Sequence, residues 1–137
     1  MPIPSALAEQ IQDLALFPDR SDRIEALIAL ADDYRSGDAE TVPRTPEHRV
    51  PGCESEVFLE VVHGTNNRVA YRFAVDNPQG ISAMALAVIL QSASPAMREE
   101  LLQIPDELVF EIFGRELSMG KNLGLTNMIR MLKHACG

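Results

Sequence analysis

Apolar residues recur at helical spacing in the first part of the chain. The pattern predicts one helix over residues 5–16, closed by Pro18. A second helix is predicted to begin at a capping pair formed by Asp22 and Glu25 and to end near residues 35–37. Both helices should cover a core with their apolar faces, which consist of Leu7, Ile11 and Leu14 in the first helix and Ile24, Leu27, Ile28 and Ala31 in the second.

The apolar pattern changes to a period of two in the middle of the chain. Residues 37–51 are rich in proline and poor in large apolar side chains, so we expect an extended approach there. Residues 56–62 and 68–75 then alternate, and residues 63–67 between them have the composition of a turn. We therefore predict an antiparallel hairpin with one packed face and one polar face.

The second half of the chain is predominantly helical by its pattern. Residues 81–90 are apolar nearly all round, which predicts a helix buried at the centre of the fold. The Ser-Pro pair at 94–95 predicts the start of a short helix that runs to about residue 103. Residues 106–118 suit both a strand and a helix, and we favour the helix.

A last amphipathic helix is predicted over residues 123–135, after a loop at residues 120–122. The elements together predict an α+β fold in which a small antiparallel sheet packs against several helices. A length of 137 residues suits a single domain over residues 1–137.

Composition narrows the function classes. The chain is 46% apolar and 23% charged, as is usual for globular proteins, and no segment approaches the length of a membrane span. The N-terminus lacks a secretory signal, so we expect a cytoplasmic protein. A net charge of −8 disfavours nucleic acid as a partner and suits docking to a basic patch on another protein.

The strongest chemical signal lies in residues 49–57, where Cys53 follows Pro51 and Gly52 and precedes the first strand. Proline fixes one backbone dihedral and glycine allows a positive φ, so the chain can turn and present the thiol at a loop apex. A thiol in that setting is typical of chemistry rather than of packing. We therefore take Cys53 as the candidate nucleophile.

Thiol chemistry requires the thiolate, which nearby positive charge favours. Candidates for that charge are His48, Arg49 and Lys121, whereas Glu54 and Glu56 oppose it. Sequence alone does not decide which charges dominate.

The remaining thiol and the histidines carry weaker signals. Cys136 adjoins the terminal Gly137, and we expect a frayed, incidental thiol there, with a second sulfur relay as the alternative. We expect no metal site, because neither Cys-x-x-Cys nor His-x-x-x-His spacing occurs among the candidate ligands Cys53, Cys136, His48, His63 and His134.

The segment Gly52-Cys53-Glu54-Ser55-Glu56-Val57 resembles the Gly-Cys-x-Ser-x-Val/Trp motif of the SufE family, the sulfur-acceptor proteins that work with cysteine desulfurases in iron-sulfur cluster assembly. The order of the predicted elements agrees with that family over essentially the whole chain. Near the C-terminus the family has a basic residue, then glycine with an apolar residue, then Met-Ile-Arg. The corresponding residues here are Lys121, Gly124-Leu125 and Met128-Ile129-Arg130, with lysine where the family has arginine.

This resemblance implies a function for the cysteine. Cys53 would accept persulfide sulfur from a pyridoxal-phosphate-dependent cysteine desulfurase, stimulate that enzyme, and pass the sulfur to an iron-sulfur scaffold. The chain itself would hold no cofactor and would show no turnover alone. Lys121 would be a charge stabiliser, and the loop and partner-binding residues would be Arg49, Pro51, Gly52, Glu54 and Ser55.

A persulfide in water is exposed to reductants, so we expect Cys53 to be shielded in the isolated protein. Val57, Phe58 and the region 123–128 are the expected apolar cover. Two other classes of function stay open. One is a thiol peroxidase or redox sensor in which Cys136 resolves an oxidised Cys53. The other is a noncatalytic interaction module.

Overall fold

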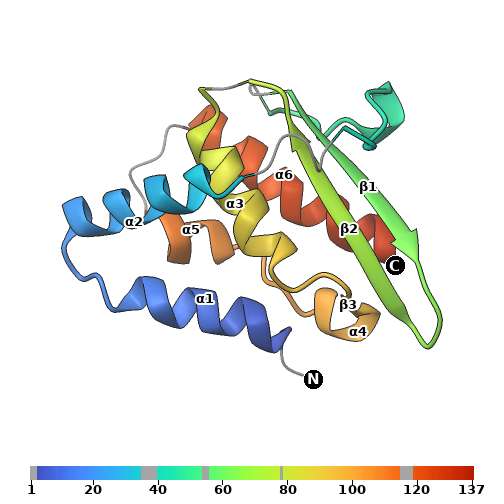
Figure 1. Cartoon of the computed structure of the whole chain (residues 1–137), viewed down its shortest axis with the longest axis horizontal. Coiled ribbons are helices and arrows are strands. Elements are labelled where there is room, and N and C mark those ends of the chain that lie inside the picture. The colour runs from blue at the N-terminus through green and yellow to red at the C-terminus, as the bar shows by residue number, and fades with distance from the viewer. Residues whose placement is uncertain (1–2, 35–39, 54–55, 78, 115–118) are drawn as a thin grey trace.

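A computed structural model describes residues 3–34, 40–53, 56–77, 79–114 and 119–137 of the chain. It has an α+β fold in which helices cover a three-stranded antiparallel sheet of order β1-β2-β3 (Figure 1). The elements are α1 (Ser5–Ala15), α2 (Arg20–Asp32), the 3-10 turn η2 (Pro46–His48), β1 (Val57–His63), β2 (Arg68–Val75), α3 (Ile81–Gln91), β3 (Ala96–Met97), α4 (Arg98–Leu101), α5 (Leu108–Phe113) and α6 (Met119–Cys136).

The predicted hairpin is confirmed. β1 pairs with β2 in a register that runs from Val57 opposite Val75 to His63 opposite Val69. In β2 the buried residues Val69, Tyr71 and Phe73 alternate with exposed ones, because successive side chains point to opposite faces of a strand. The buried face packs on α3 and α6, which lie side by side against it (Figure 1).

The predicted central helix is also confirmed. Six residues of α3 are buried, and α3 lies between the sheet and α2 (Figure 1). Full burial of one Leu or Ile side chain stabilises a fold by about 1.5 to 3 kcal/mol, so this layer is a major source of stability. Among the described residues, the largest fully buried side chains are Phe73, Leu7, Leu86, Ile89, Leu90, Leu101, Ile104, Leu108, Ile112, Met128, Ile129 and Leu132.

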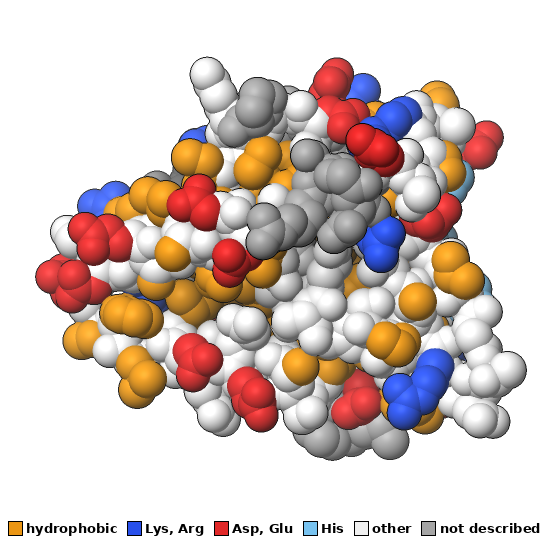
Figure 2. Space-filling model, in the orientation of Figure 1, with side chains coloured by type: hydrophobic (Ala, Val, Ile, Leu, Met, Phe, Trp, Pro, Cys, Tyr) orange, Lys and Arg blue, Asp and Glu red, His pale blue; other side chains and the backbone are white. Residues whose placement is uncertain are grey.

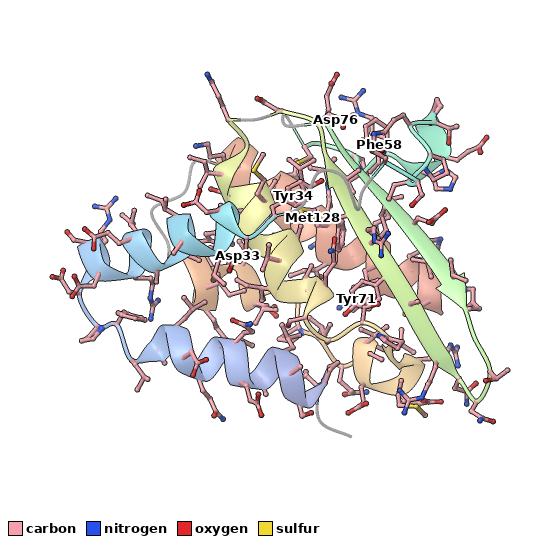
Figure 3. All side chains as sticks on the ribbon, in the orientation of Figure 1. Asp33, Tyr34, Phe58, Tyr71, Asp76 and Met128 are labelled. Atoms are coloured by element: carbon pink, nitrogen blue, oxygen red, sulfur yellow. The ribbon has the colours of Figure 1, made fainter. Side chains whose placement is uncertain are left out.

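The second face of the hairpin is less polar than expected. Phe58 and Ala74 are buried beneath Val42, which belongs to the approach segment, and Tyr34 packs against the same cluster (Figure 3). The Tyr34 hydroxyl accepts a hydrogen bond from the amide of Val75 at 2.8 Å, and burial raises the pKa of that hydroxyl. The approach segment therefore covers the second face of the hairpin where β1 begins and β2 ends.

The predicted start of α2 is wrong by a few residues. Asp19 is the capping residue, and its carboxylate accepts a hydrogen bond from the Ser21 amide at 3.3 Å. Of the predicted stripe, Leu27 and Ala31 are buried, but Ile24 and Ile28 are 44% and 42% exposed. The helix ends at Asp32, and the predicted end at 35–37 lies outside the described residues.

The helix predicted to start at the Ser-Pro pair 94–95 is also wrong. The next two residues form β3, which pairs with β2, and the short helix α4 begins only at Arg98. The Ser94 hydroxyl is used elsewhere, because its oxygen accepts a hydrogen bond from the Tyr71 amide at 3.0 Å. A side chain bonded to the sheet is not available to cap a helix.

The last two helices are largely as predicted. The helical choice for 106–118 is confirmed by α5, while residues 115–118 lie outside the described part. The last helix begins at Met119 rather than at 123, so residues 120–122 belong to its first turns. No helix within the described ranges has the length and hydropathy needed to cross a bilayer.

Acidic side chains are spread over the face formed by α1 and α2, in keeping with the net charge of −8 (Figure 2). Close to the C-terminus an acidic side chain is instead paired with basic ones. Asp106 forms ion pairs with Arg130 and Lys133, each at 2.9 Å. Hydrogen bonds from Lys133 and then Arg130 hold the pKa of the Asp106 carboxyl below its usual value.

Asp106→Asn should lower the free energy of unfolding near neutral pH by about 0.5 to 1 kcal/mol, since the pairs are partly exposed and screened. A folded-state pKa below the unfolded one stabilises the fold above the unfolded pKa, and this stabilisation is lost as the pH falls through the folded pKa. Urea unfolding of both proteins at neutral and strongly acidic pH measures the difference. A deficit of the same size at both pH values would contradict the ion-pair account.

Candidate functional site

Cys53 lies at the end of a short segment, residues 50–53, that enters the fold just before β1. The Val50 amide donates a hydrogen bond to the Val57 carbonyl at 2.8 Å, which holds the segment beside the start of the strand. Gly52 has φ +73°, a left-handed conformation that glycine adopts without a steric penalty. The turn directs Cys53 inward, and its side chain is only 8% exposed. The expected shielding of Cys53 is confirmed.

Helix α6 lies in close contact with the backbone of this segment. A Cβ atom on Gly124 would lie 2.9 Å from Cys53 Cα and 3.0 Å from the Gly52 carbonyl oxygen, closer than such atoms normally approach. The Asn127 side chain donates a hydrogen bond from Nδ2 to the Pro51 carbonyl at 2.8 Å. The helix and the segment therefore meet backbone to backbone, with a glycine at the point of contact.

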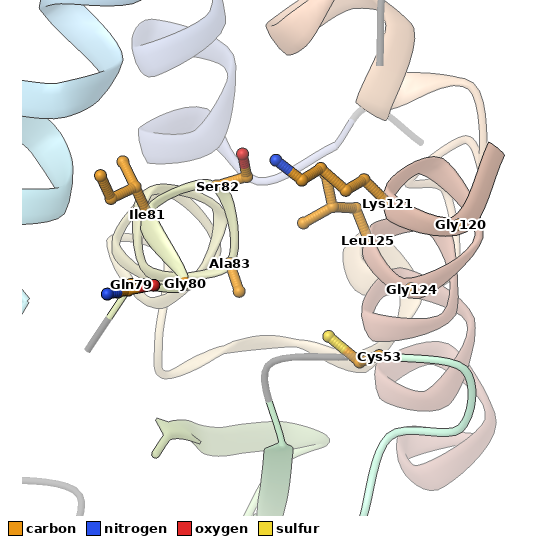
Figure 4. A pocket seen from close by; sticks show the side chains of 10 residues that line it. All are labelled: Cys53, Gln79, Gly80, Ile81, Ser82, Ala83, Gly120, Lys121, Gly124 and Leu125. Atoms are coloured by element: carbon orange, nitrogen blue, oxygen red, sulfur yellow. The ribbon is translucent and has the colours of Figure 1, made fainter. Parts of the chain in front are cut away.

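A pocket of about 170 Å³ opens beside the Cys53 side chain. One wall is the entrance and first turn of α3, residues 79–83, and the other is the start of α6 with Lys121, Gly124 and Leu125. The Cys53 sulfur points into the space between these two helices (Figure 4). The volume exceeds by far the ~15 Å³ that a single water-sized sphere needs, so an additional atom on the sulfur has room.

Lys121 lines the same pocket as Cys53, from the first turns of α6 rather than from a preceding loop. In the view of Figure 4 its side chain extends across the pocket toward Ser82, while the Cys53 sulfur lies lower between the helices. The first turn of α3 contributes partial positive charge, because the amides at a helix N-terminus point outward. The pocket thus combines apolar contacts from Ala83 and Leu125 with polar side chains from Gln79 and Ser82 and with positive charge at its rim.

Comparison with known proteins assigns the family. The sequence model of SufE, described as an Fe-S metabolism associated domain, matches residues 8–136, which is nearly the whole chain.

The chain belongs to the SufE family. Its association with iron-sulfur metabolism follows from that membership, and the resemblance drawn from the cysteine motif is confirmed. No curated protein matches the sequence.

A solved structure supports the fold of this SufE-family chain. It is similar to the solution structure of a hypothetical protein from Thermus thermophilus, with a TM-score of 0.66 and 18% sequence identity over 98% of this chain and 95% of that one. At that identity the likeness concerns the fold alone.

The other predicted site residues of the SufE chain lie at the entrance to the cysteine segment. Arg49 forms an isolated bridge with Phe58 of β1, and its side chain is exposed. Pro51 and Gly52 are exposed as well. Glu54 and Ser55 lie outside the described residues.

The expected cover of Cys53 is partly wrong. Val57 and Phe58 do not line the pocket, whereas Gly124 and Leu125 from the expected region 123–128 do. Val57 is buried in the same apolar cluster as Cys53, and Phe58 is buried in a separate one. Sequence reasoning missed the other wall, residues 79–83. A proline and a glycine precede the apolar helix in the sequence, and they predict where that helix begins. They do not predict which other segment packs against the start of the helix.

Cys136 is not the frayed thiol that we expected. It is 1% exposed at the end of α6, and its Sγ donates a hydrogen bond to the Lys133 carbonyl at 3.4 Å. Burial raises the pKa of the Cys136 thiol, which disfavours its reactive form. Among the described residues, no three His, Cys, Asp or Glu side chains are grouped as metal ligands.

The two cysteines of the SufE chain are thiols at opposite ends of α6. Cys53 contacts Gly124, and Cys136 is 12 residues further along the helix, which at 1.5 Å per residue is about 18 Å. A disulfide requires Cα atoms within about 7 Å of each other. The folded protein therefore keeps the two thiols apart.

Treatment of the folded chain with a mild thiol oxidant should produce no Cys53–Cys136 disulfide, because the geometry separates the sulfurs. Non-reducing peptide mapping measures this, and the urea-unfolded chain under the same oxidant serves as the control in which the bond can form. Ready formation of the bond in the folded protein would contradict the arrangement and would favour a redox sensor with a resolving cysteine.

Proposed function

We propose that this protein is a sulfur acceptor for iron-sulfur cluster assembly. In this proposal Cys53 takes persulfide sulfur from a cysteine desulfurase, thereby stimulates that enzyme, and delivers the sulfur to a cluster scaffold. The observation that carries the proposal is a cysteine of a SufE-family chain placed beside a pocket with room for one more sulfur atom. The whole of residues 1–137 would act as one SufE-like domain in the cytoplasm.

The transfer step is a thiol exchange. The Cys53 thiolate attacks the outer sulfur of the donor's Cys–S–SH group, a new S–S bond forms on Cys53, and the bond within the donor persulfide breaks. The donor cysteine leaves as a thiolate, and the transferred sulfur keeps its proton or releases it to solvent. No net oxidation occurs, so the step needs neither an oxidant nor a cofactor in this chain.

The pocket suits the product of that step. A persulfide is a stronger acid than a thiol and is mainly anionic near neutral pH, so positive charge stabilises it. Lys121 and the N-terminal turn of α3 supply that charge at the pocket rim, while Leu125 and Ala83 provide apolar contact. Cys53 itself is 8% exposed, so a second thiol from solvent has little access to the inner sulfur.

Because Cys53 is buried, the transfer of sulfur from another protein also requires that protein to dock at the site. A protein-bound persulfide reaches Cys53 only if the cysteine segment moves outward or the pocket rim opens. The surface around that rim includes the exposed residues Pro51, Gly52 and Lys121, together with Ile81 and Leu123, which are 46% and 51% exposed. We propose this surface, with Arg49 at its edge, as the contact area for the desulfurase.

Cys53→Ser should fold normally and lose its stimulation of a cysteine desulfurase, because an alcohol is a far weaker sulfur acceptor than a thiol near neutral pH. Sulfide or alanine production by the desulfurase, with and without each protein, measures the effect. Cys136→Ser is the matched control and should retain most of the stimulation. Full stimulation by Cys53→Ser would overturn the carrier mechanism, and a loss in Cys136→Ser would make that residue a relay.

Lys121→Met keeps an unbranched, flexible side chain that is one atom shorter but removes its charge. It should slow persulfide formation on Cys53 about threefold to fivefold, as expected for a partly exposed charge. The rate is measured with a small persulfide donor at low ionic strength. Lys133→Met is the control, since Lys133 is on the same helix as Lys121 but does not line the pocket and pairs instead with Asp106. Equal rates for wild type and Lys121→Met would reduce Lys121 to a surface charge.

A further inference from the structure

The position of Cys53 depends on two residues of α6 that take no part in the chemistry. One is Asn127, whose side-chain amide donates to the Pro51 carbonyl at 2.8 Å, at the exposed surface. Pro51 is two residues before the cysteine, so this bond ties the cysteine segment to the helix. The donor and the acceptor are 76 residues apart in the chain, so the bond joins two parts of the fold that the local backbone does not connect.

The other residue is Gly124, one helical turn before Asn127. The space that a Gly124 side chain would occupy is filled by the backbone of the cysteine segment, with Cys53 Cα at 2.9 Å and the Gly52 carbonyl oxygen at 3.0 Å from an added Cβ. Backbone atoms of a turn cannot rotate away as a flexible side chain can. Any residue larger than glycine at 124 must therefore push the segment off the helix.

The contact between the helix and the cysteine segment is also tight at Gly52. A Cβ on Gly52 would meet Asn127 Nδ2 at 3.2 Å and Leu123 Cδ2 at 3.4 Å. The two glycines thus allow the helix and the segment to approach closely enough for the Asn127 bond to form. The bond and the close approach depend on each other.

We propose that Gly124 and Asn127 are positioning residues that hold Cys53 closed against its pocket, and that breaking the Asn127–Pro51 hydrogen bond is the step that exposes the thiol. Gly124 permits the closed position and Asn127 stabilises it. Because the bond lies at the surface, a docking protein can offer the Pro51 carbonyl a new N–H donor in place of Asn127. The purpose of this opening step rests on the proposed sulfur transfer, but the opening itself is measurable without a partner.

The test is the rate at which a bulky maleimide labels Cys53 in the isolated, folded protein, followed by peptide mass spectrometry. Asn127→Ala removes the donor, and Asn127→Asp keeps the shape but places a carboxylate against the carbonyl. Cys53 labelling should rise about fivefold in the first variant, as expected for the loss of one hydrogen bond, and at least as much in the second.

Two controls separate local opening from general loosening. Asn122→Ala changes the same residue type in the same helix, where Asn122 accepts a hydrogen bond from Thr126 rather than holding the cysteine segment, and it should label like wild type. Cys136 is an internal reference, because it is 1% exposed and becomes reactive only when the C-terminal end of α6 leaves the core. Its labelling should stay unchanged in every variant.

Gly124→Ala tests the second residue. Alanine favours a helix over glycine, so a purely structural effect on α6 would slow the labelling of both cysteines. The proposal instead expects faster labelling of Cys53 with unchanged labelling of Cys136. If Gly124→Ala does not fold, the two Asn127 variants decide the question by themselves.

Equal Cys53 labelling in wild type and both Asn127 variants would overturn the proposal, and so would a parallel rise at Cys136. Neither result bears on whether Cys53 carries sulfur, which the desulfurase assay with Cys53→Ser tests. One measurement links the closed position of Cys53 to its sulfur chemistry. It is the lifetime of a persulfide preformed on Cys53 and challenged with a small thiol. That lifetime should shorten in Asn127→Ala by about the same factor as the labelling rate increases.

Discussion

The contact between the backbone of residues 50–53 and helix α6 is the constraint on which the site depends. Without a side chain on Gly124, the helix approaches Cys53 Cα and the Gly52 carbonyl closely enough to leave no space between them. That approach buries a thiol that loop position alone would expose. It also aligns the sulfur with a pocket whose two walls come from α3 and α6.

The rest of the fold keeps those two helices in place. The apolar core formed by β2, α3 and α6 fixes the distance between the pocket walls, because Phe73, Leu86 and Met128 are fully buried within it. Tyr71, at the seam between the sheet and α3, donates its hydroxyl hydrogen to the Leu90 carbonyl, and burial raises its pKa (Figure 3). Arg44, in the approach segment, pairs with Asp76 at 2.9 Å and lies 5.7 Å from the centre of the Phe58 ring. The approach to the cysteine and the exit from β2 are thus tied together.

Much of this architecture follows from local patterns in the sequence. The hairpin and the central helix were predictable because periods of two and of 3.6 residues reflect which face is buried. The strand β3 was not, since the Ser94 side chain bonds to a distant amide of β2 instead of capping a helix. The early start of α6 was missed because Gly120, with Lys121 and Asn122, has the composition of a loop. Gly124 lay within the predicted helix, and its contact with Cys53 gives a physical reason for a glycine at that position.

The candidate site, like the fold, has parts that residue types predict and parts that they do not. The cysteine and its Pro-Gly turn were evident from residue types, and the pairing of Cys53 with Lys121 in one pocket agrees with the expectation from the family motif. The wall at residues 79–83 and the burial of Cys136 arise from packing between segments far apart in the chain, and no local pattern encodes such packing. These nonlocal contacts separate the two thiols and so disfavour a disulfide switch between Cys53 and Cys136 in the folded protein.

The most direct test of whether Cys53 carries sulfur is mass spectrometry of the intact and digested chain after incubation with a cysteine desulfurase and cysteine. The account predicts a mass gain of one sulfur atom on the peptide that contains Cys53, removed by a thiol reductant and absent without the desulfurase. A chain that gains no sulfur on Cys53 while the desulfurase is active, or that gains it only on Cys136, would contradict the account.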